Sequence, residues 1–378
     1  MDCIIHIGTG KTGTTSIQNV LARRRAVLQR AGILYPETLG RTNHEAAAVC
    51  AAEFEPGFTP RKAPGVGDAA ALEAFRLDLH RRLQEEIRQS GCSKLILSNE
   101  HLFEKVRTPE QAARIRDLIG LPPGQVRIVL YIRPQPAMAA ATYAELLRMG
   151  STPPSYDKFL KTRRTEALLD YAGGLDAWAA VFGDAAITLR VFERARLTGG
   201  DVVADFAEIA GIDPALVAPG PDIDDVTTSR QSFDAAAVAF LKRFNAEVTQ
   251  LLNARGDKAA LDAFRVVRHR ARIARCIEDL NHPGPGFAFD AETVAQIRHQ
   301  HEAANAAMFA RFGVAPFTPA AVPPGGDDPA AALDTDHAFA LFARMWAEIA
   351  LNPGQHRNET PARTERSEPV SRSTGGTH

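Results

Sequence analysis

The sequence has few cysteines, almost no net charge and no long apolar run. Its four cysteines are scattered among 378 residues, with no Cys-x-x-Cys pair and no histidine cluster at metal-ligand spacing, which argues against structural zinc. Lysine and arginine number 44 against 45 acidic residues, a net charge of −1, so the basic excess typical of nucleic-acid-binding proteins is missing. No apolar run approaches the ~18 residues of a membrane span. A strand expected from residue 3 leaves no room for a signal peptide. We therefore expect a cytoplasmic protein without a metal, in which any anion site is local.

Apolar runs that alternate with amphipathic segments predict an α/β fold. Continuous apolar strands favour a parallel sheet covered by helices on both faces, a three-layer arrangement. The expected strands are 3–8, 94–100, 126–134 and 186–192. The expected helices among them are 14–31, 71–90, 109–119 and 136–149.

The C-terminal half is predicted to be almost purely helical. Helices are expected at 201–211, 233–253, 258–280 and 290–312. We expect one main domain over residues 1–319 and a helical extension over 320–350. The last segment, 351–378, is polar and rich in proline, a composition typical of a disordered tail.

The segment HIGTGKTGTT, residues 6–15, follows the first predicted strand and opens the first predicted helix. Three glycines, Gly8, Gly10 and Gly13, surround Lys11 in it. A glycine-rich loop between a strand and a helix presents backbone N–H groups and a helix N-terminus to an anion. The segment therefore predicts a phosphate-binding loop.

Two kinds of nucleotide site share this pattern, and neither is matched in full. The dinucleotide fingerprint Gly-x-Gly-x-x-Gly also needs an acidic residue after the next strand. Glu37 lies at a tolerable distance, but its apolar run is stopped by Pro36, and Lys11 has no role in such a site. A nucleotide triphosphatase would place its lysine after the second glycine and add an aspartate for Mg²⁺.

The strand 126–134 ends in YIRP, and Arg133 at such an end binds an anion and not a metal ion. One anionic group at the loop and another at Arg133 match the charges of 3′-phosphoadenosine 5′-phosphosulfate. The sequence here resembles the bacterial sulfotransferase family, whose fold is of the P-loop type. The resemblance runs from about residue 3 to 318. It rests on HIGTGKTGTTSIQ, GILYPE, NH at 43–44, LILSNEHLF, VLYIRPQ, TYAELLRMG, VFERARLTGGDVVADFAEIAGI and EAANAAMFARFG.

The resemblance implies how the donor would be bound. Lys11, with loop amides, would cradle the 5′-phosphosulfate and contact the bridging oxygen as charge develops on the leaving phosphate. This role accounts for the displaced lysine, and Arg133 would bind the 3′-phosphate. The implied donor-binding residues are Gly10, Lys11, Thr12, Gly13, Thr14, Thr15, Arg133 and Thr142.

One position departs from the family pattern. The family usually has a serine eight residues after the arginine, where it shares the 3′-phosphate, and here this position is Ala141. Three alternatives follow: Thr142 or Gln135 substitutes for the serine, the phosphate is held more weakly, or the donor differs. On a helix, Thr142 would point about 100° away from Ala141.

The acceptor side is expected after the strand 94–100. A base that takes the acceptor's proton accelerates transfer, and Glu100 aligns best with the family's base. His101 is a second catalytic candidate beside it. His44, in a region of loops, is a candidate acceptor contact, although a lone loop histidine is more often simply exposed.

The sequence therefore predicts an enzyme that moves a sulfuryl group from the phosphosulfate donor to an acceptor hydroxyl or amine, on a carbohydrate or another small molecule. No metal is needed for this chemistry. A P-loop kinase or nucleotide triphosphatase is the alternative enzyme class. A catalytically degenerate nucleotide-binding module is the alternative outside enzymology. The expected partners are the nucleotide donor and an unassigned acceptor, with no nucleic acid and no membrane span.

Overall fold

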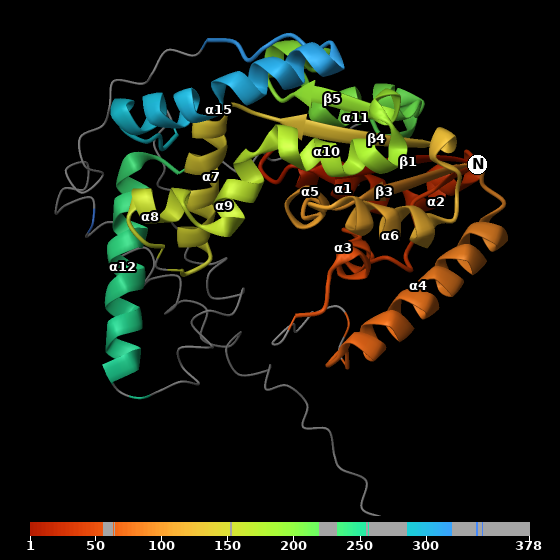
Figure 1. Cartoon of the computed structure of the whole chain (residues 1–378), viewed down its shortest axis with the longest axis horizontal. Helices are drawn as coiled ribbons and strands as arrows, with labels where there is room; N and C mark the ends of the chain where they lie inside the picture. The colour runs from red at the N-terminus through yellow and green to blue at the C-terminus, as the bar shows by residue number, and fades with distance from the viewer. Residues whose placement is uncertain are drawn as a thin grey trace, which may run out of the picture.

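The computed structural model describes residues 1–55, 63, 65–151, 153–218, 233–254, 256, 286–319, 338 and 342. Within these residues one parallel sheet has the strand order β2-β3-β1-β4-β5 (Figure 1). The predicted α/β fold with a parallel sheet is therefore confirmed. The strands are β1 (Asp2–Gly8), β2 (Ile33–Leu34), β3 (Lys94–Ser98), β4 (Val126–Ile132) and β5 (Ile187–Val191).

Helices follow nearly every strand, which is the connection that parallel strands require. The first group consists of α1 (Thr14–Arg23), α2 (Arg25–Arg30), α3 (Glu45–Ala51), α4 (Ala69–Ser90), α5 (Leu102–Lys105), α6 (Pro109–Ile119) and α7 (Gln135–Arg148). The second consists of α8 (Tyr156–Leu160), α9 (Arg163–Leu169), α10 (Tyr171–Phe182), α11 (Val202–Ala210), α12 (Ala235–Ala254) and α15 (Ala291–Phe312). Short 3₁₀ turns are η1 (Pro123–Gln125), η2 (Asp184–Ala186), η3 (Arg194–Arg196), η4 (Thr198–Gly200) and η5 (Pro214–Leu216).

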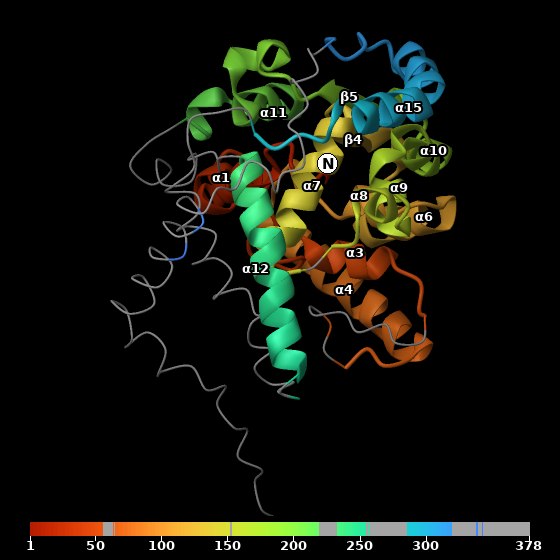
Figure 2. The same ribbon diagram turned by 90° about the vertical axis from the view of Figure 1, so that its left-hand side faces the viewer.

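The two faces of the sheet carry separate apolar cores, because successive strand residues point to opposite faces. In β1, Cys3, Ile5 and Ile7 pack with α3, α4, α6 and α10, whereas Ile4 packs with α1 and α11. Figure 2 shows α1 and α11 on one side of the strands and α6 and α10 on the other. This layering leaves the strand ends as the place where loops from both faces meet.

A third core lies beside the sheet, around α7. Met138, Tyr143 and Leu147 of that helix pack against α8, α9, α12 and α15 (Figures 1 and 2). The helix that follows β4 is thus held on several sides, and its N-terminal end stands at the edge of the sheet beside Arg133.

Capping signals set the bounds of α6 where the sequence predicts them. Thr108 and Gln111 form a capping box, Pro109 occupies the first turn, and Gly120 ends the helix in the left-handed region at φ 70°. A glycine at that position avoids the steric cost of a side chain. The predicted range 109–119 is confirmed.

The C-terminal predictions fall partly outside the described residues. The helices predicted at 201–211, 233–253 and 290–312 correspond to α11, α12 and α15. The helix predicted at 258–280 and the tail 351–378 lie outside the described residues, as does the extension 320–350 apart from residues 338 and 342. No helix in the described part of the chain is long and apolar enough to cross a membrane.

Candidate functional site

Three adjacent strands end at the same edge of the sheet. β1 lies between β3 and β4, and all three run parallel, so their carboxyl ends are neighbours. The loop from Gly8 to Gly13 leaves β1, Glu100 follows β3, and Arg133 follows β4. Parallel α/β sheets bind ligands at this edge. The residues singled out in three distant segments of the sequence are therefore brought together.

Two positions of the loop require glycine because other segments pack closely against the loop backbone there. Gly8 has φ 113°, and a Cβ there would lie 2.8 Å from the carbonyl oxygen of Glu100. Gly13 has φ 76°, and its Cβ would lie 2.6 Å from Cγ1 of Val202. Both conformations strongly favour glycine. Gly10 differs, since a Cβ there would meet nothing within 4 Å, so its backbone borders open space.

The side chains of Thr9 and Thr12 stabilise the loop by hydrogen bonds to backbone carbonyls. Thr9 donates its hydroxyl to the carbonyl of Tyr131 at 3.0 Å, and Thr12 donates to the carbonyl of Thr9 at 2.6 Å. Both threonines are fully buried. Thr12 was predicted to contact the donor, and its hydroxyl is engaged inside the loop instead. Thr14 and Thr15 open α1, whose first N–H groups have no partner within the helix.

Arg133 is a partly buried cation without a carboxylate partner in the described part of the chain. Its one hydrogen bond there runs from Nη1 to the carbonyl of Lys11, at 3.4 Å. Its own carbonyl accepts a hydrogen bond from the hydroxyl of Tyr171 at 2.8 Å, which fixes the backbone. Burial lowers the pKa of the guanidinium below its usual value. A buried charge of this kind is costly unless an anion compensates it.

Lys11 reaches from the loop to α7. Its φ is 66°, in the left-handed region, and Nζ forms an ion pair with Oε2 of Glu145 at 2.7 Å. Arg148, one turn further along α7, approaches the same oxygen at 3.4 Å. Glu145 was not singled out from the sequence. In this structure the carboxylate of Glu145 is paired with the ammonium group of Lys11. That ion pair would have to break before Lys11 could bind an anion.

The carboxylate of Glu100 is held by two amides. Gln18 of α1 donates to Oε2 at 2.8 Å, and Asn43 contacts both oxygens at 3.2 and 3.3 Å. Asn43 is itself fixed by a hydrogen bond from Asn99 at 3.2 Å. Hydrogen bonds from two side-chain amides restrict the rotamers of the carboxylate. Sequence reasoning missed Gln18, although a polar side chain on the apolar stripe of Ile17, Val20 and Leu21 is a usable signal.

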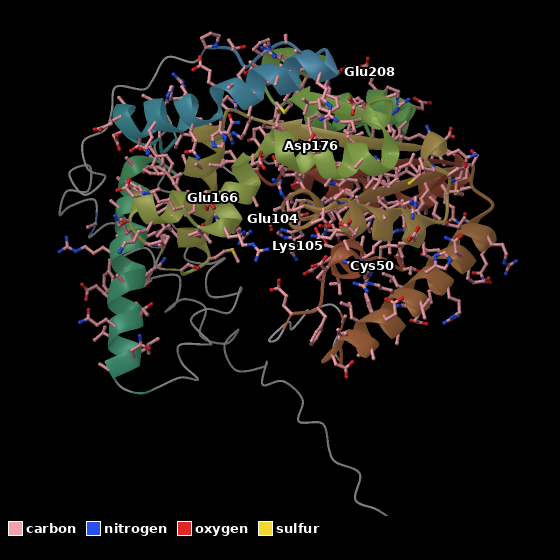
Figure 3. The ribbon with its side chains drawn as sticks, viewed as in Figure 1. Cys50, Glu104, Lys105, Glu166, Asp176 and Glu208 are labelled. Atoms are coloured by element: carbon pink, nitrogen blue, oxygen red, sulfur yellow. The ribbon has the colours of Figure 1, made fainter. Side chains whose placement is uncertain are left out.

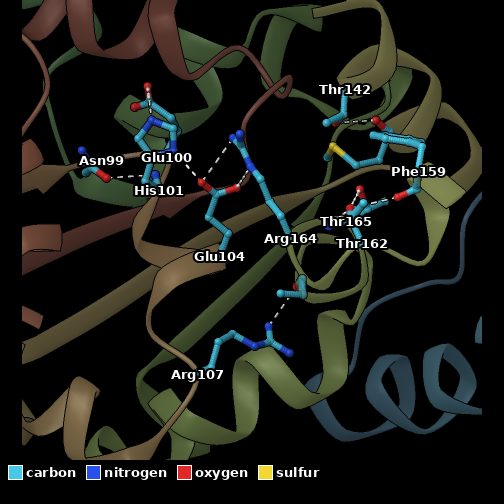
Figure 4. Close-up of polar contacts among 12 residues, drawn as sticks. Asn99, Glu100, His101, Glu104, Arg107, Thr142, Phe159, Thr162, Arg164 and Thr165 are labelled. Carbon is cyan, nitrogen blue, oxygen red and sulfur yellow. Dashed lines mark hydrogen bonds and ion pairs between the residues drawn. The ribbon is translucent and has the colours of Figure 1, made fainter. Parts of the chain in front are cut away.

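His101 lies beside Glu100 and is oriented by a second carboxylate. Its Nδ1 is 2.8 Å from Oε1 of Glu104, and its Nε2 is 3.8 Å from Oε1 of Glu100 (Figure 4). The backbone N–H of His101 donates to Asn99 at 2.9 Å. Both catalytic candidates predicted after β3 therefore lie within one hydrogen-bonded group.

His44 is buried and does not face an open acceptor side. It accepts a hydrogen bond through Nδ1 from the N–H of Ser98 at 3.1 Å, and its ring lies 4.3 Å from that of Tyr35. Burial is the main cause that lowers its pKa to about 3. The residue is neutral and shielded from solvent, so we do not retain it as an acceptor contact. The expectation of simple exposure was also wrong.

Both candidate replacements for the serine absent at position 141 already make hydrogen bonds within the protein. Thr142 donates its hydroxyl to the carbonyl of Met138 in its own helix, at 2.8 Å. Gln135 exchanges two amide hydrogen bonds with Asn305 of α15, at 2.7 and 3.0 Å. The hydroxyl of Thr142 would have to leave Met138 to donate to an anion at Arg133.

Within the described residues, no group of three His, Cys, Asp or Glu side chains is placed to hold a metal ion. No family model matches the sequence, and neither does any curated protein. Among solved structures, the chain is similar to a sulfotransferase from Alicyclobacillus acidocaldarius, at 18% identity and a TM-score of 0.36. The alignment covers 70% of this chain and 98% of that one.

Proposed function

We propose that the protein is a sulfotransferase that moves a sulfuryl group from 3′-phosphoadenosine 5′-phosphosulfate to an acceptor hydroxyl or amine. The observation that carries the proposal is Arg133, whose guanidinium is partly buried at the ligand-binding edge of the sheet and has no carboxylate partner among the described residues. A site of this kind is completed by an anion. The loop beside it is a second place for an anion.

The donor's two anionic groups fit these two places. Arg133 would bind the 3′-phosphate, with its planar group suited to two parallel hydrogen bonds. The N–H groups of Gly13, Thr14 and Thr15 at the start of α1, with Lys11, would bind the 5′-phosphosulfate. The open space beside Gly10 supports a close approach of the ligand to the loop backbone.

The reaction then needs a base for the acceptor's proton and a cation that stabilises the leaving phosphate. The acceptor oxygen or nitrogen attacks the sulfur, the bond from sulfur to the bridging phosphate oxygen breaks, and the acceptor loses a proton. Glu100, anchored by Gln18 and Asn43, takes that proton. Lys11 leaves Glu145 and stabilises the negative charge that grows on the leaving phosphate.

Calorimetric titration without divalent metal tests the proposal. Adenosine 3′,5′-bisphosphate should bind to the parent protein in EDTA, and NAD should not bind. ATP with Mg²⁺ is titrated in parallel, because a kinase or triphosphatase would bind it and would ignore the bisphosphate. Binding of ATP with Mg²⁺ but not of the bisphosphate would refute the sulfotransferase.

A further inference from the structure

The carboxylate of Glu100 has one oxygen better placed to receive a proton than the other. Oε2 accepts from Gln18 at 2.8 Å and from Asn43 at 3.3 Å, so both of its lone pairs are engaged. Oε1 accepts only from Asn43, at 3.2 Å, among the described residues. Oε1 is also the atom 3.8 Å from Nε2 of His101. Oε1 is therefore the oxygen that keeps a free proton-accepting position, and it also approaches the imidazole.

The far side of the imidazole is fixed by Glu104. That side chain is only 12% exposed and accepts from Nδ1 at 2.8 Å (Figure 4). Burial acts to raise the pKa of Glu104, but the hydrogen bond from His101 and the charge of Arg164 outweigh it, and the pKa lies below its usual value. An ionised carboxylate only accepts, so Nδ1 must carry the proton. With Nδ1 turned to Glu104, Nε2 is the ring nitrogen that faces Glu100, at 3.8 Å from Oε1.

We propose that Glu104, His101 and Glu100 form a proton relay that carries the acceptor's proton away from the transfer site. This relay rests on the proposed function. The acceptor O–H or N–H proton moves to Oε1 of Glu100, and then from the resulting carboxylic acid to Nε2 of His101. Glu100 returns to the carboxylate, and the imidazolium is paired with Glu104. Water takes the proton from the ring, whose side chain is 33% exposed.

The separation of 3.8 Å exceeds a hydrogen bond by about 0.6–1.1 Å, which a small rotation of the ring closes. Glu104 acts only through His101, so it is a positioning residue. Arg164 lies 3.3 Å from Glu104 and is 58% exposed, and it supports the carboxylate without touching the imidazole.

The tautomer of His101 tests the geometry without any nucleotide. Nitrogen-15 spectra of the parent, with the His101 signals assigned by loss in His101→Asn, should show the Nδ1–H form. Glu104→Gln should shift the population toward Nε2–H, because an amide can donate to Nδ1. Glu166→Gln, on the exposed side of α9, keeps the contact between Glu104 and His101, and its tautomer should match the parent. An Nε2–H form in the parent would overturn the relay.

Turnover of the phosphosulfate donor, with water as the acceptor, tests the function of the relay. Glu104→Gln should lower turnover at least about tenfold, since a wrong tautomer disables a base oriented by a carboxylate. Binding of adenosine 3′,5′-bisphosphate should not change. Glu166→Gln removes an exposed carboxylate of the neighbouring α9 and is the matched control (Figure 3). It should turn over like the parent.

A double-mutant cycle separates the relay from a structural effect. Glu104→Gln combined with His101→Gln should lose no more turnover than His101→Gln alone, because both changes break one path. Additive losses, equal losses in Glu166→Gln, or parental turnover in Glu104→Gln would overturn the relay alone. Absence of bisphosphate binding by the parent would overturn the relay together with the proposed function.

Discussion

Replacing Arg133 by methionine should stabilise the free protein and destabilise its nucleotide complex. In the free protein the guanidinium is partly buried with one long hydrogen bond, 3.4 Å to the carbonyl of Lys11, and no carboxylate among the described residues. Methionine has a similar length and needs no solvation. Relief of an uncompensated buried charge is worth about 1 kcal/mol, the low end for such replacements because the side chain is only partly buried. The thermal midpoint should rise by about 2 °C.

The effect on the complex has the opposite sign. Loss of charge-assisted hydrogen bonds to a phosphate costs about 2–3 kcal/mol, which weakens adenosine 3′,5′-bisphosphate binding about 30- to 150-fold. At a ligand concentration of 100 times the parent's dissociation constant, the ligand adds about 2.7 kcal/mol to the free energy of unfolding of the parent protein. The variant at the same ligand concentration should gain only about 0.3–0.9 kcal/mol. In thermal unfolding, the variant should therefore have the higher midpoint without ligand, and the parent should have the higher midpoint with ligand.

Arg190→Met on the neighbouring β5 is the matched control. Arg190 pairs with Asp205, which is 1% exposed and also accepts a hydrogen bond from Tyr131 at 2.7 Å. Removing Arg190 leaves that carboxylate without its cation and should destabilise the fold by on the order of 2–3 kcal/mol. The reasoning fails if Arg133→Met lowers the midpoint of the free protein as Arg190→Met does. It fails equally if Arg133→Met responds to the bisphosphate like the parent.

The remaining predictions address the other charged residues of the site. Lys11→Met should reduce donor turnover about 10²–10³-fold and weaken bisphosphate binding only moderately; full turnover would show that the lysine is not catalytic. Glu100→Gln should reduce turnover about 10²–10⁴-fold at unchanged bisphosphate affinity, and parental activity in steady-state assays would remove it as the base. Ala141→Ser should tighten bisphosphate binding by about 0.5–1.5 kcal/mol in calorimetry, and no gain would place the 3′-phosphate away from this turn of α7. Glu145→Gln should tighten bisphosphate binding by up to about 1 kcal/mol, and by less at high salt, because the ligand no longer competes with Glu145 for Lys11. Weaker binding in calorimetry would contradict this competition.

The strands that carry the site could be predicted because their apolar runs are continuous and bounded by turn residues. β1, β3, β4 and β5 lie within the predicted ranges or differ from them by a residue or two. β2 could not be predicted, since Ile33–Leu34 is too short to show a pattern. It is a strand because Ile33 pairs with Lys94 and Leu34 pairs with Leu95. Pairing with a distant segment leaves no local signal.

The helix α10 shows how tertiary packing overrides local preference. The segment YAGGLDAWAAVF contains Gly173 and Gly174, and glycine disfavours a helix interior by about 1 kcal/mol relative to alanine. No helix is predicted there from pattern. In the structure a Cβ on Gly174 would lie 2.5 Å from the ring of Phe103 and 2.4 Å from Arg107. The glycine is needed for close contact with the segment after β3, which also carries Glu100 and His101.

The order of the strands, more than any single motif, determines which charges meet. With β1 in the middle, the loop carrying Lys11 lies between Glu100 after β3 and Arg133 after β4. Lys11 and Arg133 are thus neighbours at this edge, and Glu100 lies on the other side of the loop. The sequence shows each charge at a strand end, but only the order β3-β1-β4 places a proton acceptor across the loop from the buried guanidinium. A lysine inside the turn, with φ 66°, stands between them, where the proposed reaction would develop negative charge on a leaving phosphate.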